Sequence, residues 1–360
     1  MNSIQCIDCG APYPDSGVPY CCIRCGGLFD YGNGISYNPT EFDQNRKGIW
    51  KFGTNLGIGT IEEVVTLGEG NTPLLGTLVD GKEICIKCEY ANPTGSFKDR
   101  GMAALVTVLR NRNVKTAVED SSGNAGASFA AFAAKSGIAA RIYIPDSSSG
   151  PKRRQIEAYG AEIIPIGGPR VNAASAAMNA VRTGANYASH AYQPFNLLGY
   201  ATCAYELVGQ LGRAPGAVIL PAGQGGLLLG MAKGFQAMVN SGAIHAMPRV
   251  VAVQPETCAP LVSLMNGEPF IGDCQTMAEG VRISQPLRGA EIVKQVLDSK
   301  GCIRVVSEAG ITKGRHELAK LGFYVEPTSA LVWDAAMQII NELPEPIVLI
   351  LTGSGYKTRD

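Results

Sequence analysis

The chain has 360 residues, of which 46% are hydrophobic and 17% are charged. This length can bury a sizeable core and predicts two packed units. Lysine plus arginine and aspartate plus glutamate both number 31, so the formal net charge is zero. A balanced charge does not favour a nucleic-acid or anionic-membrane partner. No apolar run approaches the ~18 residues of a membrane helix, so no membrane role is expected.

The first residues and the use of cysteine indicate a compartment. The opening stretch MNSIQCIDCG does not have the pattern of a signal peptide. The eleven cysteines are an odd number and mostly scattered, which suits a reducing cytosol better than a disulfide scaffold. We therefore expect a cytoplasmic protein.

Two cysteine pairs distinguish the first 35 residues from the rest. They are Cys6 with Cys9 and Cys22 with Cys25, and twelve residues separate the pairs. A glycine follows each pair, as in zinc knuckles, and four thiolates at this spacing suit tetrahedral zinc. We predict a zinc-ribbon-like extension over residues 1–35 that would hold a structural zinc ion. A metal-free relic or a disulfide is the alternative.

From about residue 80, short apolar strands alternate with helical segments. The expected strands are 82–90, 114–120, 140–145, 161–167, 216–223, 249–254 and 346–355. The expected helices are 98–111, 124–137, 151–160, 171–184 and 227–239. This alternation predicts an α/β protein with two doubly wound, mainly parallel sheets. We expect a large domain over 36–100 and 205–360 and a small mobile domain over 101–204.

The turns after the strands are the expected ligand sites, because such sheets bind ligands beyond the carboxyl ends of their strands. The turn PAGQGGL, residues 221–227, opens a helix, and its glycines let the backbone approach an anion. It predicts a phosphate cradle, although tight packing is an equal alternative. It has neither the G-x-G-x-x-G pattern nor the Walker lysine.

Two further turns carry short polar side chains. Ser121, Ser122 and Asn124 lie between a strand and a helix, which suits a carboxylate. Simple helix capping is the alternative reading. Thr352 stands at the carboxyl end of the last strand, where a threonine often has no further role.

Lys98 stands where a helix begins, although the helix dipole opposes a positive charge there. Burial and this dipole both favour the neutral amine, which is the form that attacks an aldehyde. Pyridoxal phosphate and an amino-acid substrate together require four features: a neutral amine, a phosphate cradle, a carboxylate pocket and a neutral hydroxyl such as that of Thr352. Such a hydroxyl beside the pyridine nitrogen suits elimination and replacement better than transamination.

Six stretches of the chain occur in the order seen in threonine synthases: LGEGNTPLL, NPTGSFKDRG, SSGNAGAS, PAGQGGL, VEPTSA and LTGSGYK. Over residues 60 to 360 the chain resembles the fold-type-II (tryptophan synthase β-like) pyridoxal phosphate enzymes. The resemblance implies that Lys98 is the Schiff-base lysine and general base, that Phe97 flanks the ring and that Asn124 bonds its phenolic oxygen. It also implies that Thr352 meets the pyridine nitrogen. The implied phosphate ligands are the amides of Gly223, Gln224, Gly225, Gly226 and Leu227.

The same resemblance implies that Ser121 and Ser122, with the amides near Asn124, hold the substrate carboxylate, and that the enzyme is a homodimer. One stretch departs from the family, because Tyr200 and Ala201 replace a polar residue and a lysine. Lys152, with Arg153 and Arg154 beside it, is the candidate replacement for the lost charge.

The resemblance predicts a lyase that converts O-phospho-L-homoserine and water to L-threonine and phosphate. The alternative is a β-replacement or β-elimination enzyme acting on O-phosphoserine, serine or threonine, similar to cysteate or cysteine synthases or to dehydratases. His190 follows a strand and could line the mouth of the site, but we interpret it as a structural histidine.

Overall fold

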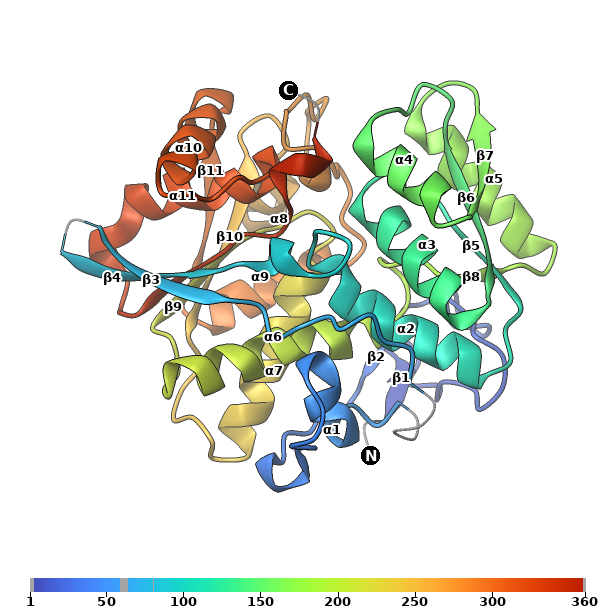
Figure 1. Cartoon of the computed structure of the whole chain (residues 1–360), viewed down its shortest axis with the longest axis horizontal. Helices are drawn as coiled ribbons and strands as arrows, with labels where there is room; N and C mark the ends of the chain where they lie inside the picture. Colours follow the sequence, from blue (N-terminus) through green and yellow to red (C-terminus); the bar gives the residue numbers. More distant parts are fainter. Residues whose placement is uncertain (1–2, 59–63, 80, 359–360) are drawn as a thin grey trace. The chain divides into compact units, whose positions relative to one another are not determined.

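The computed structural model describes residues 3–58, 64–79 and 81–358, and its chain divides into two compact units (Figure 1). The first unit contains Met1–Gly70, Lys98–Gly199 and Thr358–Asp360, and the second contains Asn71–Phe97 and Tyr200–Lys357. Residues 36–58 and 64–70, which the sequence predicts to be part of the large domain, group here with the first unit. A physical reason is that the backbone N–H of Val65 donates to Thr107 Oγ1 over 2.9 Å.

The first unit is built on a four-stranded parallel sheet in the order β7-β6-β5-β8. Its strands are β5 (Thr116–Glu119), β6 (Ala139–Pro145), β7 (Glu162–Ile166) and β8 (Asn186–Tyr187). Its helices are α1 (Gly53–Leu56), α2 (Lys98–Asn111), α3 (Asn124–Ser136), α4 (Pro151–Ala158) and α5 (Arg170–Arg182). Helices α3 and α4 lie on one side of the strands and α5 on the other (Figure 1).

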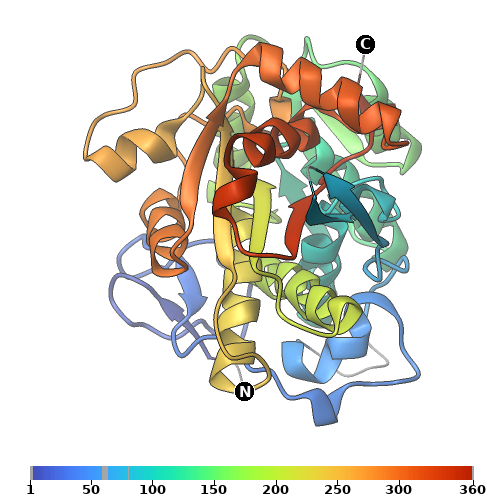
Figure 2. The same ribbon diagram turned by 90° about the vertical axis from the view of Figure 1, so that its left-hand side faces the viewer.

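The N-terminal extension, the dark blue ribbon of Figure 2, pairs β1 (Ile4–Cys6) with β2 (Phe29–Tyr31) in an antiparallel ladder. It has a small core of its own, which contains Cys6, Ala11, Cys22 and Phe29. The Arg112 guanidinium, just after α2, donates to the Pro14 carbonyl over 2.9 Å and lies 5.1 Å from the centre of the Tyr13 ring. The extension is therefore packed onto the rest of the first unit.

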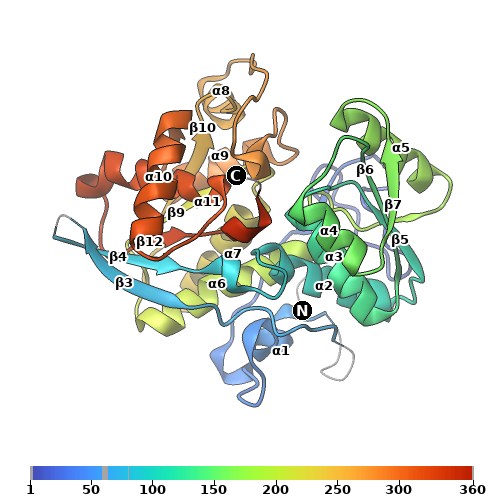
Figure 3. The same ribbon diagram turned by 45° about the horizontal axis from the view of Figure 1, so that its top comes forward.

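The second unit contains a six-stranded sheet in the order β11-β10-β9-β12-β4-β3, parallel except for β3. Its strands are β3 (Leu74–Val79), β4 (Lys82–Lys87), β9 (Ala217–Pro221), β10 (Arg249–Pro255), β11 (Cys302–Val306) and β12 (Ile347–Ile350). Strand β12 lies between β9 and β4, as Figure 3 shows. The parallel strand directions, with helices between the strands, confirm the expected α/β class with mainly parallel sheets.

Helices cover both faces of this second sheet, and α10 and α11 lie on the opposite side from α7 (Figure 1). The helices are α7 (Gly226–Asn240), α8 (Pro260–Asn266), α9 (Gly289–Asp298), α10 (Glu308–Lys320) and α11 (Pro327–Ile339), and the last part of α6 (Phe195–Leu211) belongs here too. One hydrophobic core cluster combines buried residues of the sheet strands with buried residues of α11. None of the helices formed by the described residues is long and apolar enough to cross a membrane.

One disulfide joins Cys258 to Cys274 in the second unit. It closes a segment that contains α8 and follows the carboxyl end of β10. The scattered spacing of the cysteines did not predict this bond.

Candidate active site

The glycine-rich turn after β9 lies at the carboxyl edge of the second sheet. Gly225 is the N-cap of α7 and has φ +75°, a left-handed conformation that favours glycine. A Cβ atom there would lie 2.1 Å from Cδ1 of Ile292, and one at Gly223 would lie 3.1 Å from the Gly280 carbonyl oxygen. The turn can therefore hold only glycine at Gly225. The glycines at 223, 225 and 226 place no side chains of their own beside the backbone amides at the start of α7, an arrangement that can bind anions.

Thr352 follows β12, the strand beside β9, so it stands at the same edge of the sheet as the glycine turn. Its side chain is buried, and its Oγ1 lies 3.1 Å from Oγ of Ser329 in α11. Ser329 Oγ also accepts a hydrogen bond of 2.8 Å from the Gly353 backbone N–H. The hydroxyl is thus fixed between a neighbouring hydroxyl and the end of the strand.

The segment that leads to Lys98 is tied to the end of β12. The Phe97 backbone N–H donates to the Thr352 carbonyl over 3.0 Å, and Ser96 forms a bridge with Gly353. The Phe97 ring centre lies 5.3 Å from that of Tyr200. Lys98 is the next residue of the chain and the first of α2, as the sequence predicts.

The turn before α3 carries the predicted carboxylate-binding residues of the first unit. Ser121 is buried, and its Oγ accepts a hydrogen bond of 3.2 Å from the Gly123 backbone N–H. Asn124 is the first residue of α3. A Cβ atom at Gly126 would lie 1.9 Å from the Ser121 carbonyl oxygen, so only glycine fits the first turn of this helix. The turn places polar side chains and the start of a helix together at the end of β5.

Lys152 lies on the face of α4 that packs against the start of α3. Lys152 and Ile156 are the buried residues of α4 and are four positions apart, so they share one face. Cδ1 of Ile156 lies 3.3 Å from the Cβ position of Gly126. By contrast, Arg153 donates to Glu157 on the surface, and Arg154 is exposed. Of the three predicted basic residues, Lys152 is therefore the one placed near the Ser121–Asn124 turn.

Glu119 and His190 form a pair beside that turn, which the sequence pattern did not predict. Nδ1 of His190 lies 2.8 Å from Oε1 of Glu119, the last residue of β5. Burial raises the pKa of Glu119, although the Ser121 backbone N–H and nearby cations oppose the shift. Burial is the main cause that holds the pKa of His190 well below its usual range, and the Arg170 guanidinium acts in the same direction. One sequence feature could have indicated a partner for Glu119, because an acidic residue ends an apolar strand directly before a polar turn.

The two residues that depart from the family pattern are core residues here. Tyr200 and Ala201 are both fully buried in α6. Cε2 of Tyr200 lies 3.1 Å from the Cβ position of Gly226, so the ring packs on the glycine turn. The Ala201 carbonyl oxygen lies 2.8 Å from the Cβ position of Gly234, where α6 crosses α7. The close contact restricts position 234 to glycine, and Ala201 itself is buried at this crossing.

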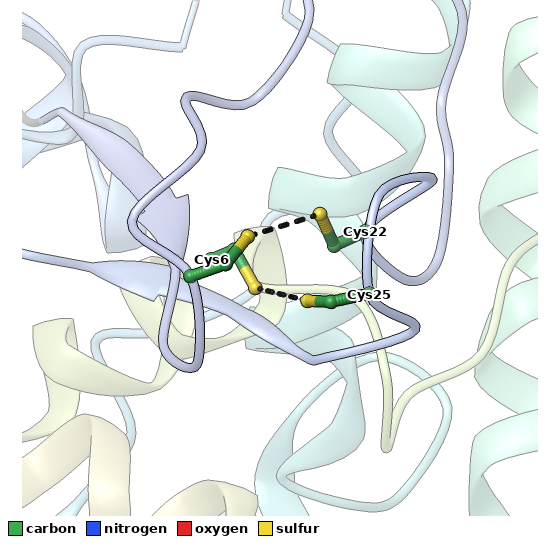
Figure 4. A group of neighbouring side chains, drawn as sticks. Cys6, Cys22 and Cys25 are labelled. Carbon is green, nitrogen blue, oxygen red and sulfur yellow. Dashed lines mark hydrogen bonds between the residues drawn. The ribbon is translucent and has the colours of Figure 1, made fainter.

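The four cysteines of the extension converge. Their sulfur atoms all lie within 4.8 Å of one another, and Figure 4 shows three of them, Cys6, Cys22 and Cys25. Sγ of Cys6 lies 3.4 Å from that of Cys25, and Sγ of Cys9 lies 3.7 Å from that of Cys22. The glycines after the pairs have φ values of +69° and +78°, and their N–H groups donate to the carbonyls of Cys6 and Cys22. The glycines therefore close two tight knuckles around the sulfurs.

Comparison with known proteins places this site in a family. Residues 65–353 match the family described as "Pyridoxal-phosphate dependent enzyme". The chain is 31% identical over 378 residues to a threonine synthase of Methanocaldococcus jannaschii, covering 99% of this chain and 93% of that one. It is 33% identical to a threonine synthase of Mycobacterium tuberculosis (strain H37Rv), and the match covers 89% of this chain and 92% of that one.

Solved structures of the same fold act on different amino acids. A T.th. threonine deaminase matches with a TM-score of 0.68 and 29% identity, covering 80% of this chain and 93% of that one. Maize serine racemase matches with a TM-score of 0.69 and 25% identity, and the match covers 79% of this chain and 88% of that one. The fold alone therefore does not choose among these reactions.

The chain belongs to the pyridoxal-phosphate dependent enzymes, with the expected type II fold, because the match spans most of its length. Pyridoxal phosphate is its cofactor. Within this family it is a threonine synthase-like lyase, since relatives with that name cover nearly the whole chain at about 30% identity.

Proposed function

We propose that this enzyme converts O-phospho-L-homoserine and water to L-threonine and phosphate. The observation that carries the proposal is the match to threonine synthases along 99% of the chain, which includes the N-terminal extension. The deaminase and racemase structures match only about four fifths of the chain.

The residues of the second unit fit the cofactor. We assign its phosphate to the amides of the turn after β9, where close packing requires glycine at position 225. These residues are Gly223, Gln224, Gly225, Gly226 and Leu227. Thr352, buried at the end of the adjacent strand, would meet the pyridine nitrogen. A phosphate cradle and a neutral hydroxyl at neighbouring strand ends support this assignment.

Lys98 is the proposed covalent anchor and general base. Bound pyridoxal phosphate supplies an electron sink that makes protons near the amino group of the substrate acidic. Lys98 then removes the α-proton and afterwards a β-proton, so that phosphate can leave from the γ-carbon. Its place at the start of α2 supports a neutral amine in this role. Phe97 would flank the ring, and Asn124 would bond its phenolic oxygen.

The substrate groups would bind in the first unit. Ser121 and Ser122, with the amides near Asn124, would hold the carboxylate at the start of α3. Lys152 would attract the distal phosphate of the substrate. Its buried place on the face of α4 that packs on this turn supports the assignment. The phosphate of phosphohomoserine is attached to the γ-carbon, so it requires a cation farther from the carboxylate than the leaving group of a β-substituted amino acid does.

The absence of a lysine at position 201 keeps a second function open. Ala201 is buried at a helix contact, so this position offers no cation. The alternative is β-replacement or β-elimination on O-phosphoserine, serine or threonine, which needs one proton abstraction and a shorter pocket.

Product analysis distinguishes the two functions. The enzyme is incubated with O-phospho-L-homoserine, and both phosphate and threonine are measured. Equal amounts of the two products are expected. Phosphate without threonine would mean elimination only. No release of phosphate would favour O-phosphoserine, which is tested in parallel.

We also propose that Cys6, Cys9, Cys22 and Cys25 bind one structural zinc ion. The convergence of four sulfur atoms within 4.8 Å supports a tetrahedral thiolate site. All four ligands come from the protein, so such a site has no open position for catalysis.

A further inference from the structure

Glu119 and His190 form an acid–base pair to which the proposed reaction gives no role. Glu119 ends β5, His190 follows β8, and the two strands are parallel neighbours. The Glu119 side chain is 0% exposed and that of His190 is 12% exposed. A buried carboxylate is costly unless it is hydrogen-bonded or paired, so each of these groups requires the other.

The pair is bonded directly to the proposed carboxylate-binding turn. The Ser121 backbone N–H donates to Oε2 of Glu119, while His190 bonds Oε1. A substrate carboxylate held at the start of α3 would therefore lie close to a second, buried carboxyl group. Two like charges in a poorly solvated place disfavour each other, and taking up a proton removes the conflict.

The surrounding charges leave the pair able to accept a proton. Arg170 of α5 is a permanent cation and opposes protonation, whereas Lys98 of α2 would oppose it only as an ammonium and not as the neutral amine proposed above. Asp120 lies beside Glu119, accepts a hydrogen bond of 2.8 Å from the Tyr187 hydroxyl and favours protonation. Burial holds the pKa of His190 low, and an added anion would act in the opposite direction.

We propose that Glu119 and His190 are positioning residues that together take up one proton when the substrate carboxylate binds at Ser121–Asn124. This proposal rests on the proposed role of that turn. The proton comes from solvent, forms an N–H or O–H bond on the pair, and returns to solvent when the product leaves. Binding therefore tightens as pH falls through the range where the pair titrates and weakens as pH rises through it.

The three histidines of the chain allow a direct test. The holoenzyme is labelled with ¹⁵N-histidine, and the imidazole signals are recorded with and without butyrate, a carboxylate that lacks an amino group. We expect the His190 signals to move toward the protonated ring or the other tautomer. His245 and His316, both exposed and in the second unit, serve as internal controls and should not change.

The affinity for butyrate, followed by the visible absorbance of the cofactor, gives a second readout. In the wild type it should fall by up to about tenfold per pH unit over the titrating range, the limit for one linked proton. Glu119→Gln should flatten this dependence, and His245→Gln should not. An unchanged pH dependence in Glu119→Gln would overturn the proposal.

The wild-type spectra decide the question even if Glu119→Gln fails to fold. Butyrate that binds without changing the His190 signals would overturn the proton uptake and leave the role of the turn intact. Butyrate that does not bind at all would overturn both the proton uptake and the assignment of the turn.

Discussion

Nζ of Lys87 lies 2.9 Å from Oε2 of Glu206, and the lysine side chain is completely buried. Lys87 ends β4, and its ammonium also donates to the Thr72 carbonyl and to Oε1 of Gln210. The pair fixes the end of the strand from which the segment leading to Lys98 departs.

Lys87→Met is expected to destabilise the second unit strongly. It leaves the Glu206 carboxylate buried without its charge partner, which typically costs about 3–5 kcal/mol. Urea unfolding measures the change. Lys82→Met is the matched control. Lys82 begins β4, the strand that Lys87 ends, but its ion pair with Glu345 lies at the surface. That exposed pair should contribute less than about 1 kcal/mol. Equal effects of the two variants would contradict this account.

Gly225→Ala is expected to weaken cofactor binding. The new Cβ meets Ile292 and forces a left-handed residue into strain, which shifts the amides in front of the proposed phosphate. Losing one hydrogen bond to a charged group costs about 1.5–3 kcal/mol, so affinity for pyridoxal phosphate should fall about tenfold or more. Titration of apoenzyme with the cofactor measures it. Gly242→Ala has the same backbone strain in open space and should bind normally. Normal binding by Gly225→Ala would remove the turn from the site.

Glu69 should make stability pH-dependent. Burial raises its pKa to about 6, while hydrogen bonds from the Leu67 backbone and the Trp50 indole oppose the shift. The folded state thus holds its proton more tightly than the unfolded state, so stability falls as pH rises from about 4.5 to about 6. The total loss is on the order of 2 kcal/mol.

Glu69→Gln tests this, because an amide does not titrate. Unfolding free energies measured across that pH range should fall less steeply in the variant than in the wild type. Glu41→Gln, at an exposed position, should follow the wild type. Parallel curves for Glu69→Gln and the wild type would show that another group is responsible.

The extension should carry one zinc ion per chain. Elemental analysis of protein purified without chelator measures the stoichiometry, and Cys9→Ser should lower it. Cys21→Ser is the control, since Cys21 neighbours Cys22 but is outside the four-sulfur cluster. A value near zero in the wild type would make the extension a metal-free relic.

Much of the fold was predictable because its strands and helices follow local patterns. Helix α2 has the predicted bounds 98–111, and α3 ends one residue before the prediction. Strand β3 was missed, since it is an edge strand with several exposed residues and no regular alternation. The pairing of Glu119 with His190 was also missed, because it depends on β5 and β8 becoming neighbours across 71 residues of sequence. The interpretation of Ala201 as a lost ligand position stays a prediction, and its burial where α6 crosses α7 could not be predicted from the sequence.

The central claim is that Lys98 carries the cofactor, and peptide mapping tests it most directly. Borohydride reduction of the holoenzyme fixes the cofactor to the lysine that binds it, and mass spectrometry then locates the modified peptide. The account predicts modification at Lys98, and it predicts that Lys98→Ala shows no labelled peptide and no turnover. Labelling at another lysine, or near-normal turnover in Lys98→Ala, would contradict it.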